Sequence, residues 1–108
     1  MIDYISISST RLQELFDNGG PDCVAMWMKY AYHCKRQKTN QVKATQVFME
    51  NGMGWGRDKT RAVKETLIEL GYIEQLSRKD KHGKIVGWFI KVNHLPKTSK
   101  DRKYTKYE

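Results

Sequence analysis

The sequence is short of cysteine and proline, and it contains no long apolar run. It has two cysteines and two prolines among 108 residues. No apolar stretch approaches the roughly 20 residues that a membrane-spanning helix needs. The first residues also lack the basic segment and apolar stretch of a secretory signal. We therefore expect a cytoplasmic protein that does not associate with a membrane.

The motifs of the common enzyme classes are missing as well. The glycine-rich run at residues 52–56 lacks the Lys-Ser/Thr pair of a phosphate-binding loop. The sequence contains no nucleophile elbow and no Cys/His spacing typical of a zinc site. No pair of carboxylates is placed by the pattern to act as acid and base in one cleft. We therefore expect no enzyme activity, no cofactor and no bound metal.

The length and the aromatic content predict one folded domain. A chain of 108 residues fits a single core, to which three Trp, six Tyr and three Phe can contribute. From Pro96 onward the pattern forms no core and is typical of a disordered or linker segment. Basic residues interleaved with Tyr104 and Tyr107 could instead hold a single nucleic-acid strand. We expect the domain at residues 1–95 and a basic tail at residues 96–108.

The positive charge is concentrated in the second half of the chain. Residues 1–54 carry six basic and five acidic side chains, a balance of +1, whereas residues 55–108 carry fourteen and seven, a balance of +7. Residues 78–106 alone hold ten basic and two acidic groups. Such an uneven field favours a polyanionic partner, and nucleic acid is the leading candidate. The alternative is a basic surface that serves only solubility.

Apolar spacing and turn residues predict the elements of the first half of the chain. The run Asn18-Gly19-Gly20-Pro21 ends a first helix, and Pro21 suits the first turn of the next one. The second helix is apolar around most of its circumference, so we expect it to be the central buried helix. A third helix is expected to face the core with Ala44, Val47 and Phe48. The expected elements are a strand at residues 4–8, helices at 10–18, 21–36 and 43–51, and a polar loop at 37–43.

The second half of the chain predicts one more helix and a β-hairpin. A fourth helix begins after the glycine-rich turn and ends at Gly71, which is a good C-terminal cap. Its expected inward face, at helical spacing, consists of Thr60, Val63, Leu67 and Leu70. Two strands then flank a polar loop, as in a hairpin with a charged tip. The expected ranges are 57–70 for the helix, 72–77 and 85–92 for the strands, and 78–84 for the loop.

The tryptophans and cysteines are expected to serve mainly the core. We place Trp27 and Trp88 inside the protein. Trp55, in the turn before the fourth helix, is expected to plug the core, with a stacking role as the alternative. Cys23 and Cys34 are eleven residues apart on one helix, which separates them by about 16 Å along its axis. They cannot form a disulfide within that helix, so we expect two buried thiols.

The order of these elements predicts an α+β fold that is mainly α, a winged helix-turn-helix with a short N-terminal strand. Two helices joined by a tight glycine-containing turn form a helix-turn-helix, and the hairpin that follows supplies a wing. An α-helix fits the major groove of DNA, while a basic loop can reach the flanking phosphates. We therefore expect double-stranded DNA as the partner.

The fourth helix is the expected reading element. Its two exposed edges differ in charge, because Asp58, Glu65 and Glu69 lie on the edge opposite the basic one. The expected DNA-binding residues of this helix are Arg57, Lys59, Thr60, Arg61 and Lys64. We assign the two arginines to base edges or nearby phosphates and the two lysines to phosphates. The alternative is that these charges form ordinary solvated pairs along the helix.

The hairpin loop is the second expected contact. Phosphate contacts from a wing fix the register of a protein on DNA without reading the sequence, and a histidine adds charge near neutral pH. The expected DNA-binding residues of the wing are Arg78, Lys79, Lys81, His82 and Lys84. A hairpin tip that is charged only to prevent edge-to-edge aggregation is the alternative.

The stretch at residues 55–74 resembles the recognition helix and first wing strand of bacterial and phage winged-helix proteins. The closest resemblance is to the N-terminal domains of phage and plasmid replication initiators, called replisome organisers, and it spans about residues 2–93. Thr60 and Lys64 depart from the family pattern, which has Val and an apolar residue there. The matching positions are Gly56, Arg57, Asp58, Arg61, Leu67, Gly71, Tyr72 and Ile73. The resemblance implies binding of origin DNA and recruitment of other replication proteins through a region outside this chain.

Three functions compete on this evidence. The first is DNA binding for replication initiation of a phage, plasmid or other mobile element. The second is a transcriptional regulator, a repressor that would bind a palindromic site as a homodimer. The third is a protein-interaction adaptor or inhibitor built on the same fold, which should present an exposed apolar patch instead of a basic edge and a basic wing. The charge favours the first two.

Overall fold

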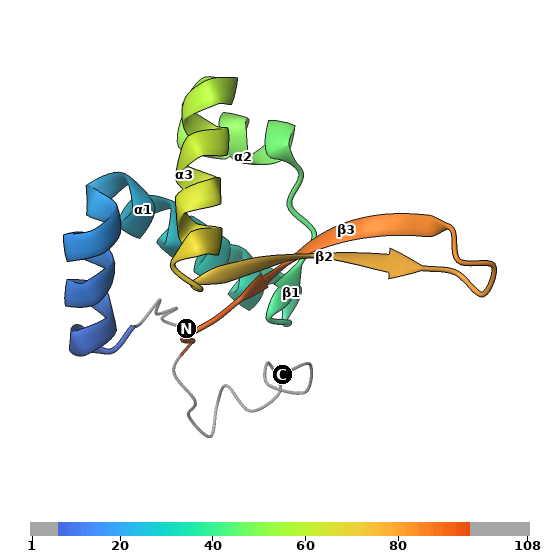
Figure 1. The fold of residues 1–108 in the computed structure, drawn as a ribbon, viewed down its shortest axis with the longest axis horizontal. Helices are drawn as coiled ribbons and strands as arrows, with labels where there is room; N and C mark the ends of the chain where they lie inside the picture. The colour runs from blue at the N-terminus through green and yellow to red at the C-terminus, as the bar shows by residue number, and fades with distance from the viewer. Residues whose placement is uncertain (1–6, 96–108) are drawn as a thin grey trace.

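The structure is a computed structural model that describes residues 7–95, and it is an α+β fold dominated by helix (Figure 1). Within this range, Ile7 and Ser8 are not part of a strand, and the rest of the strand expected at 4–8 lies outside it, as does the tail at 96–108. The observed elements are α1 (Ser9–Gln37), β1 (Gln41–Val42), α2 (Gln46–Met53), α3 (Arg57–Glu69), β2 (Ile73–Lys79) and β3 (Ile85–Val92).

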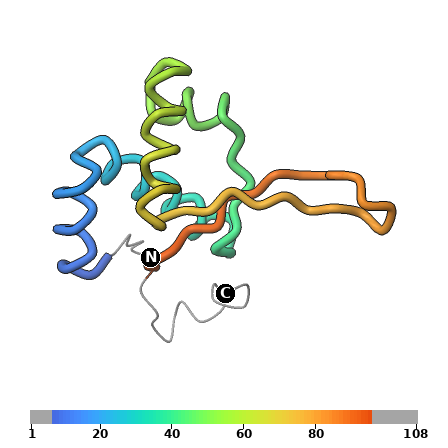
Figure 2. The backbone as a smooth tube through the Cα atoms, viewed as in Figure 1, coloured from blue at the N-terminus to red at the C-terminus, as the bar shows by residue number. Residues whose placement is uncertain are grey.

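The two helices expected at 10–18 and 21–36 are the two arms of α1, which bends sharply between them (Figures 1 and 2). The first arm begins at Ser8, whose Oγ accepts a hydrogen bond of 3.2 Å from the backbone N–H of Arg11. Gly20 breaks the helix because its φ of 79° and ψ of 177° are not helical, and Pro21 restarts it. The predicted boundary is therefore confirmed.

The second arm of α1 is the centre of the core, as the sequence predicts. Trp27 is fully buried, and its indole N–H donates a 3.1 Å hydrogen bond to the carbonyl of Asn93. Both cysteines are buried free thiols, and burial raises the pKa of Cys34 to about 12. The remaining buried apolar residues are Leu15, Met26, Tyr30, Ala31, Val42, Met49, Leu67, Tyr72, Ile73, Ile90 and Val92.

The loop expected at 37–43 contains a strand that the sequence analysis missed. β1 pairs antiparallel with β3, with Val42 opposite Ile90, and the three strands run in the order β1-β3-β2. A strand of two residues is too short to show a period-2 pattern, so only its tertiary pairing defines it. This pairing covers the base of the hairpin and buries Val42.

The helix expected at 43–51 lies three residues later, and its inward face is different from the predicted one. Thr45 caps α2 by accepting a 3.1 Å hydrogen bond from the N–H of Phe48, and Gly54 ends it at a φ of 71°. With this start, Met49 is buried, while Val47 is 62% exposed and Phe48 is also exposed. The prediction that Val47 and Phe48 face the core is wrong.

β2 and β3 form a hairpin that we call the wing, and its outer half projects beyond the helices (Figures 1 and 2). The strand at 85–92 is confirmed, whereas β2 continues to Lys79, two residues past its predicted end. The prediction that Trp88 belongs to the core is wrong, because its exposure is 55%. It lies on the part of β3 that extends past the helical layer, so no helix covers it.

The first arm of α1 is held to the end of α3 by Tyr72 and Gly19. The Tyr72 hydroxyl lies 2.8 Å from Glu14 Oε1 and 2.9 Å from the carbonyl of Arg11, either of which accepts its proton. Burial and the hydrogen bond to Glu14 raise the pKa of Tyr72 to about 12. Gly19 packs so closely that an added Cβ would lie 3.3 Å from Leu70 Cδ1.

We predict that Gly19→Ala lowers the free energy of unfolding by about 1–3 kcal/mol, the usual cost of overpacking. The new Cβ would lie 2.8 Å from both Cβ and Sγ of Cys23, which the surrounding core holds in place. Gly52→Ala is the matched control, because its Cβ would meet only the flexible end of Lys29, at 3.1 Å. Urea unfolding followed by circular dichroism measures both variants. Equal midpoints would contradict the packing at the α1 bend.

Candidate nucleic-acid interface

α3 is held at its N-terminal end by α2 and by the turn between the two helices. Gly54 and Gly56 flank this turn, and the Gln46 side chain donates a 3.2 Å hydrogen bond to the carbonyl of Arg57. Figure 1 shows this end of α3 pointing away from the sheet. The first turn of α3 is therefore fixed by its neighbours and presented at one end of the molecule.

Thr60 is not available to a ligand. It is fully buried, and its hydroxyl donates a 2.8 Å hydrogen bond to the carbonyl of Gly56. The same carbonyl also accepts the backbone N–H of Thr60, and the bond from the hydroxyl removes the cost of burying it. The prediction that Thr60 binds DNA is therefore corrected, whereas its place on the inward face of α3 is confirmed, as is that of Leu67.

Arg57 and Arg61 are both exposed on α3, one turn apart. The Arg57 side chain is 72% exposed, and its Nε lies 3.8 Å from Asp58 Oδ1, a long contact between two solvated groups. Arg61 forms no ion pair with any residue in the 7–95 range. The structure thus leaves both guanidinium groups free to bind an acceptor outside the chain.

Lys59 differs from the two arginines because the protein itself supplies its partners. Its Nζ lies 3.5 Å from Asp22 Oδ2 on α1 and 4.5 Å from the centre of the Trp55 ring. Trp55 is half-buried and packs against the core, as expected of a plug. Lys59 therefore connects α3 with α1 and with the turn before it, and a phosphate would have to compete with Asp22.

Lys64 lies at the border between the buried and the exposed side of α3. Its side chain is half-buried, and burial lowers its pKa, an effect that the neighbouring charge of Glu65 partly offsets. A lysine is compatible with this border position. The aliphatic stem can cover apolar surface while the amine reaches water.

The exposed side of α3 carries charge of both signs. Asp58, Glu65 and Glu69 are exposed on the same helix as Arg57 and Arg61. Asp58 lies in the first turn of α3, beside Arg57, whereas Glu65 and Glu69 lie in the C-terminal half and repel a polyanion that approaches there. A nucleic acid can meet α3 favourably only at its first two turns, where both arginines lie.

The wing tip is a compact turn organised by Asp80. Its Oδ1 accepts hydrogen bonds from the backbone N–H groups of His82 (2.8 Å) and Lys84 (3.0 Å). The Asp80 N–H donates to the carbonyl of Lys84, and Gly83 takes a φ of 81°. The Asp80 carboxylate thus accepts hydrogen bonds from the backbone of the turn. It forms no ion pair with a wing lysine among the residues described.

The wing cations are exposed and, in the part of the chain that the structure covers, none of them forms an ion pair. The Arg78 side chain is held in place by two contacts within the protein. Its guanidinium lies 4.4 Å from the centre of the Phe89 ring and donates a 3.2 Å hydrogen bond to Gln41 Oε1. The exposed set of cations comprises Arg78, Lys79, Lys81 and Lys84, with His82 between them. It is separate from the cations of α3, because the two elements diverge (Figure 1).

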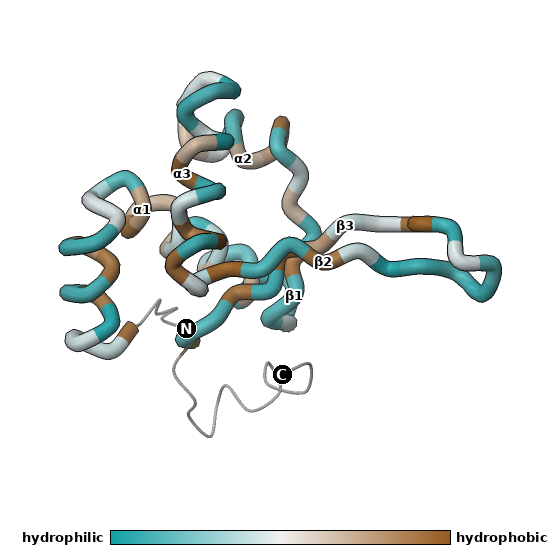
Figure 3. Tube along the Cα trace, viewed as in Figure 1, coloured by the Kyte–Doolittle hydropathy of each residue, from teal (hydrophilic) through white to brown (hydrophobic). Residues whose placement is uncertain are grey.

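Exposed apolar side chains on β3 are the feature that the sequence analysis missed. Val86 is 63% exposed, and Ile85 and Trp88 are exposed with it. Figure 3 shows this hydrophobic segment of β3 next to the hydrophilic tip. A continuous apolar run is typical of a strand that is buried on both faces, so the sequence pattern pointed away from a surface position.

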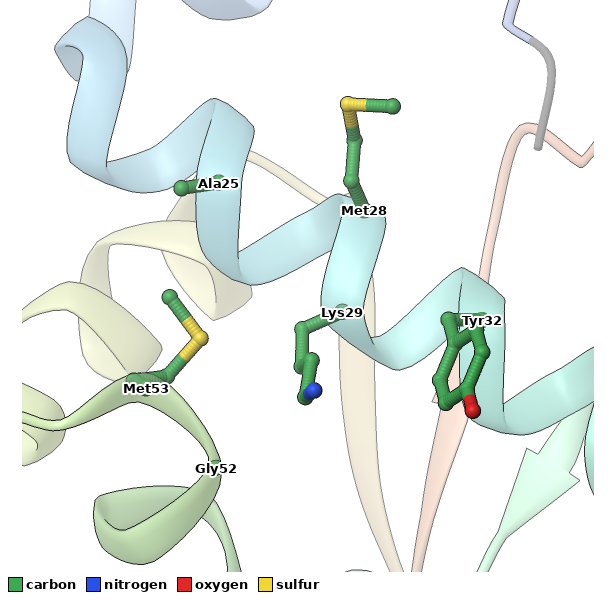
Figure 4. A pocket seen from close by; sticks show the side chains of 6 residues that line it. All are labelled: Ala25, Met28, Lys29, Tyr32, Gly52 and Met53. Carbon is green, nitrogen blue, oxygen red and sulfur yellow. The ribbon is translucent and has the colours of Figure 1, made fainter.

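A shallow groove of about 390 Å³ lies between α1 and α2 (Figure 4). Lys29 is the one charged residue in its lining, beside two methionines and Tyr32, so the groove holds no acid–base pair. The lining residues are Ala25, Met28, Lys29, Tyr32, Gly52 and Met53.

In residues 7–95 no group of three or more His, Cys, Asp or Glu side chains is placed to bind a metal ion. No helix in that range combines the length and apolarity needed to cross a membrane.

Comparisons of the chain with protein-family models, with curated proteins and with solved structures find no match. The resemblance to replication initiators therefore stays a prediction made from the residues. The geometry of α3 and the wing is the basis for the function proposed below.

We predict that Asp80→Ala loosens the wing tip without unfolding the domain. Losing the shared acceptor should speed hydrogen exchange at the amides of His82 and Lys84, because each loses its hydrogen-bond partner. The indole N–H of Trp27 should keep its protection. Asp17→Ala removes the same charge from α1 and serves as the control. Unchanged exchange at both wing amides would contradict the hydrogen bonds to Asp80.

Proposed function

We propose that this chain binds double-stranded DNA as a winged helix. In this proposal the first two turns of α3 enter the major groove, and the wing follows the phosphates beside it. The observation that carries the proposal is the set of exposed cations, Arg57 and Arg61 on α3 and four on the wing, that have no acidic partner closer than the 3.8 Å contact of Arg57. The arrangement α2–turn–α3–hairpin supports it.

The two surfaces have different tasks in this proposal. On a helix in the major groove, one arginine can donate hydrogen bonds to both N7 and O6 of a guanine, which selects a sequence. Lysines on a hairpin tip meet phosphates, which adds affinity and fixes the register. Glu65 and Glu69, in the C-terminal half of α3, limit the helix contact to its N-terminal end, so the DNA lies nearer to Arg57 than to Glu69.

For the biological role we propose replication initiation of a phage, plasmid or other mobile element in the cytoplasm, on the resemblance at residues 55–74. A repressor that binds DNA as a homodimer is the alternative within the same activity. Selection of duplexes from a random pool at about 0.15 M salt separates the two. Repeated sites in one direction support an initiator, whereas a palindrome supports a dimeric repressor.

One observation favours a second candidate, a protein-interaction module. Tyr32, Val47 and Phe48 are exposed apolar groups, and the His33 ring lies 5.1 Å from that of Tyr32 and 4.8 Å from that of Phe48. This cluster on α1 and α2 is an exposed apolar patch of the kind that docks a partner. A domain that binds no duplex at any salt concentration would favour this reading.

We predict that Arg57→Ala and Arg61→Ala each weaken binding to the selected duplex about tenfold and reduce sequence preference, since one bidentate arginine contributes about 1–3 kcal/mol. Fluorescence anisotropy with the selected and a scrambled duplex measures both effects. Arg11→Ala, an exposed arginine on the first arm of α1, is the control. Unchanged affinity in both variants would exclude α3 as the reading helix.

We predict that replacing Lys79 and Lys81 together by Ala weakens binding to all duplexes alike. The slope of log affinity against log salt should fall by about 1.8, at about 0.9 for each lost phosphate contact. Sequence preference should not change. A slope equal to that of the unmodified protein would show that the wing lysines do not touch the duplex.

A further inference from the structure

The two faces of the wing differ in how they are covered. Direct cross-strand pairs share a face, and residues two apart on a strand do too. Trp88 pairs with Ser77 and lies two residues before Ile90, which is buried against the core. Trp88 therefore continues the core-facing side of the sheet. Val86, which is also exposed, lies where the register shifts and has no cross-strand partner.

The opposite face has its own cover. Leu76 pairs with Phe89, whose ring is covered by the guanidinium of Arg78 at 4.4 Å. The Trp88 indole has no comparable partner: within the described residues no ring and no cation lies against it. The residue across from it, Ser77, is too small to cover an indole. The ring is thus an exposed aromatic surface on a strand.

We propose that Trp88 stacks against unpaired bases of single-stranded DNA, while the wing lysines hold the phosphates of the same strand. The inference rests on the proposed function, because it takes DNA as the ligand of the wing. It goes beyond that function, because it assigns a single strand and a base contact to a hairpin that otherwise touches only duplex phosphates.

The charge around Trp88 favours single-stranded DNA as the ligand. Three exposed lysines, Lys79, Lys81 and Lys84, lie between Trp88 and the end of the hairpin, whereas Arg78 covers Phe89 on the opposite face. The one nearby carboxylate, on Asp80, already accepts two backbone hydrogen bonds. A protein partner would have to bring its own acidic groups, whereas a nucleic-acid strand carries one phosphate for each base. Aromatic groups beside a basic strip are the usual means of binding single strands.

The position of the wing also suits the proposal. Figures 1 and 2 show the hairpin projecting past the helices, so its outer half is accessible while α3 is engaged elsewhere. The Arg78–Phe89 contact and the Asp80 turn stiffen the hairpin from the other face and from the tip. A stacking group on a stiff arm loses little conformational freedom on binding.

The test is fluorescence anisotropy with a labelled oligo(dT) of about 15 nucleotides, alongside the selected duplex. Trp88→Ala should weaken binding to oligo(dT) about tenfold, and Trp88→Phe should restore most of it, because phenylalanine also stacks. The salt slope should stay that of the unmodified protein, since no cation is lost. Phe16→Ala, which removes an exposed aromatic from α1, should change nothing.

The outcomes separate this inference from the proposed function. Loss of oligo(dT) binding in Trp88→Ala supports the inference, even if the selected duplex is not bound and the duplex proposal fails. Duplex binding that needs Arg57, together with oligo(dT) binding that is absent or unaffected by Trp88→Ala, overturns the inference alone. A change of oligomeric state in Trp88→Ala, measured by sedimentation, would also overturn the inference. It would assign the exposed apolar side chains of β3 to a contact between copies of the chain. Unchanged hydrogen exchange across the wing shows that the variant still forms the hairpin.

Discussion

The second arm of α1 holds the rest of the structure together, and Trp27 is its main anchor. The indole is fully buried and donates its N–H to the carbonyl of Asn93, just past the end of β3. Two backbone bonds at the same place, from Val92 to Asn40 and from Asn93 to Tyr72, tie the inner end of the sheet to the chain on both sides. Support for the sheet is therefore concentrated at one end, which leaves Ile85, Val86 and Trp88 exposed on the outer part of β3.

Internal use of the carboxylates leaves the positive charge of the wing uncompensated. Asp22 pairs with Lys59, Asp80 caps the wing turn, and Glu74 lies 3.8 Å from Lys91. The hydrogen bond from Tyr72 lowers the pKa of Glu14, so this carboxylate too is stabilised within the domain. The wing lysines have no such partners among the described residues. Among the described residues, uncompensated positive charge therefore lies on the hairpin and at the first turns of α3.

Local signals predicted most of the fold and part of the site. Glycine and proline at residues 20 and 21 predict the bend of α1, and Gly71 predicts the end of α3, since both depend on backbone conformations that only neighbouring residues decide. The inward face of α3 follows from helical spacing. The exposure of Arg57 and Arg61 follows from the same spacing, because both lie outside the inward-facing stripe of the helix.

The bend of α1, the inward face of α3, the hairpin and the uneven charge could be predicted from the residues, because each depends on a few neighbouring positions. The start of α2, the pairing of Lys59 with Asp22, the strand at residues 41 and 42 and the exposure of Trp88 could not be predicted in this way. The last three depend on segments far apart in the chain. An apolar run predicts burial only if another element lies over it, and whether one does is set by where the helices stop.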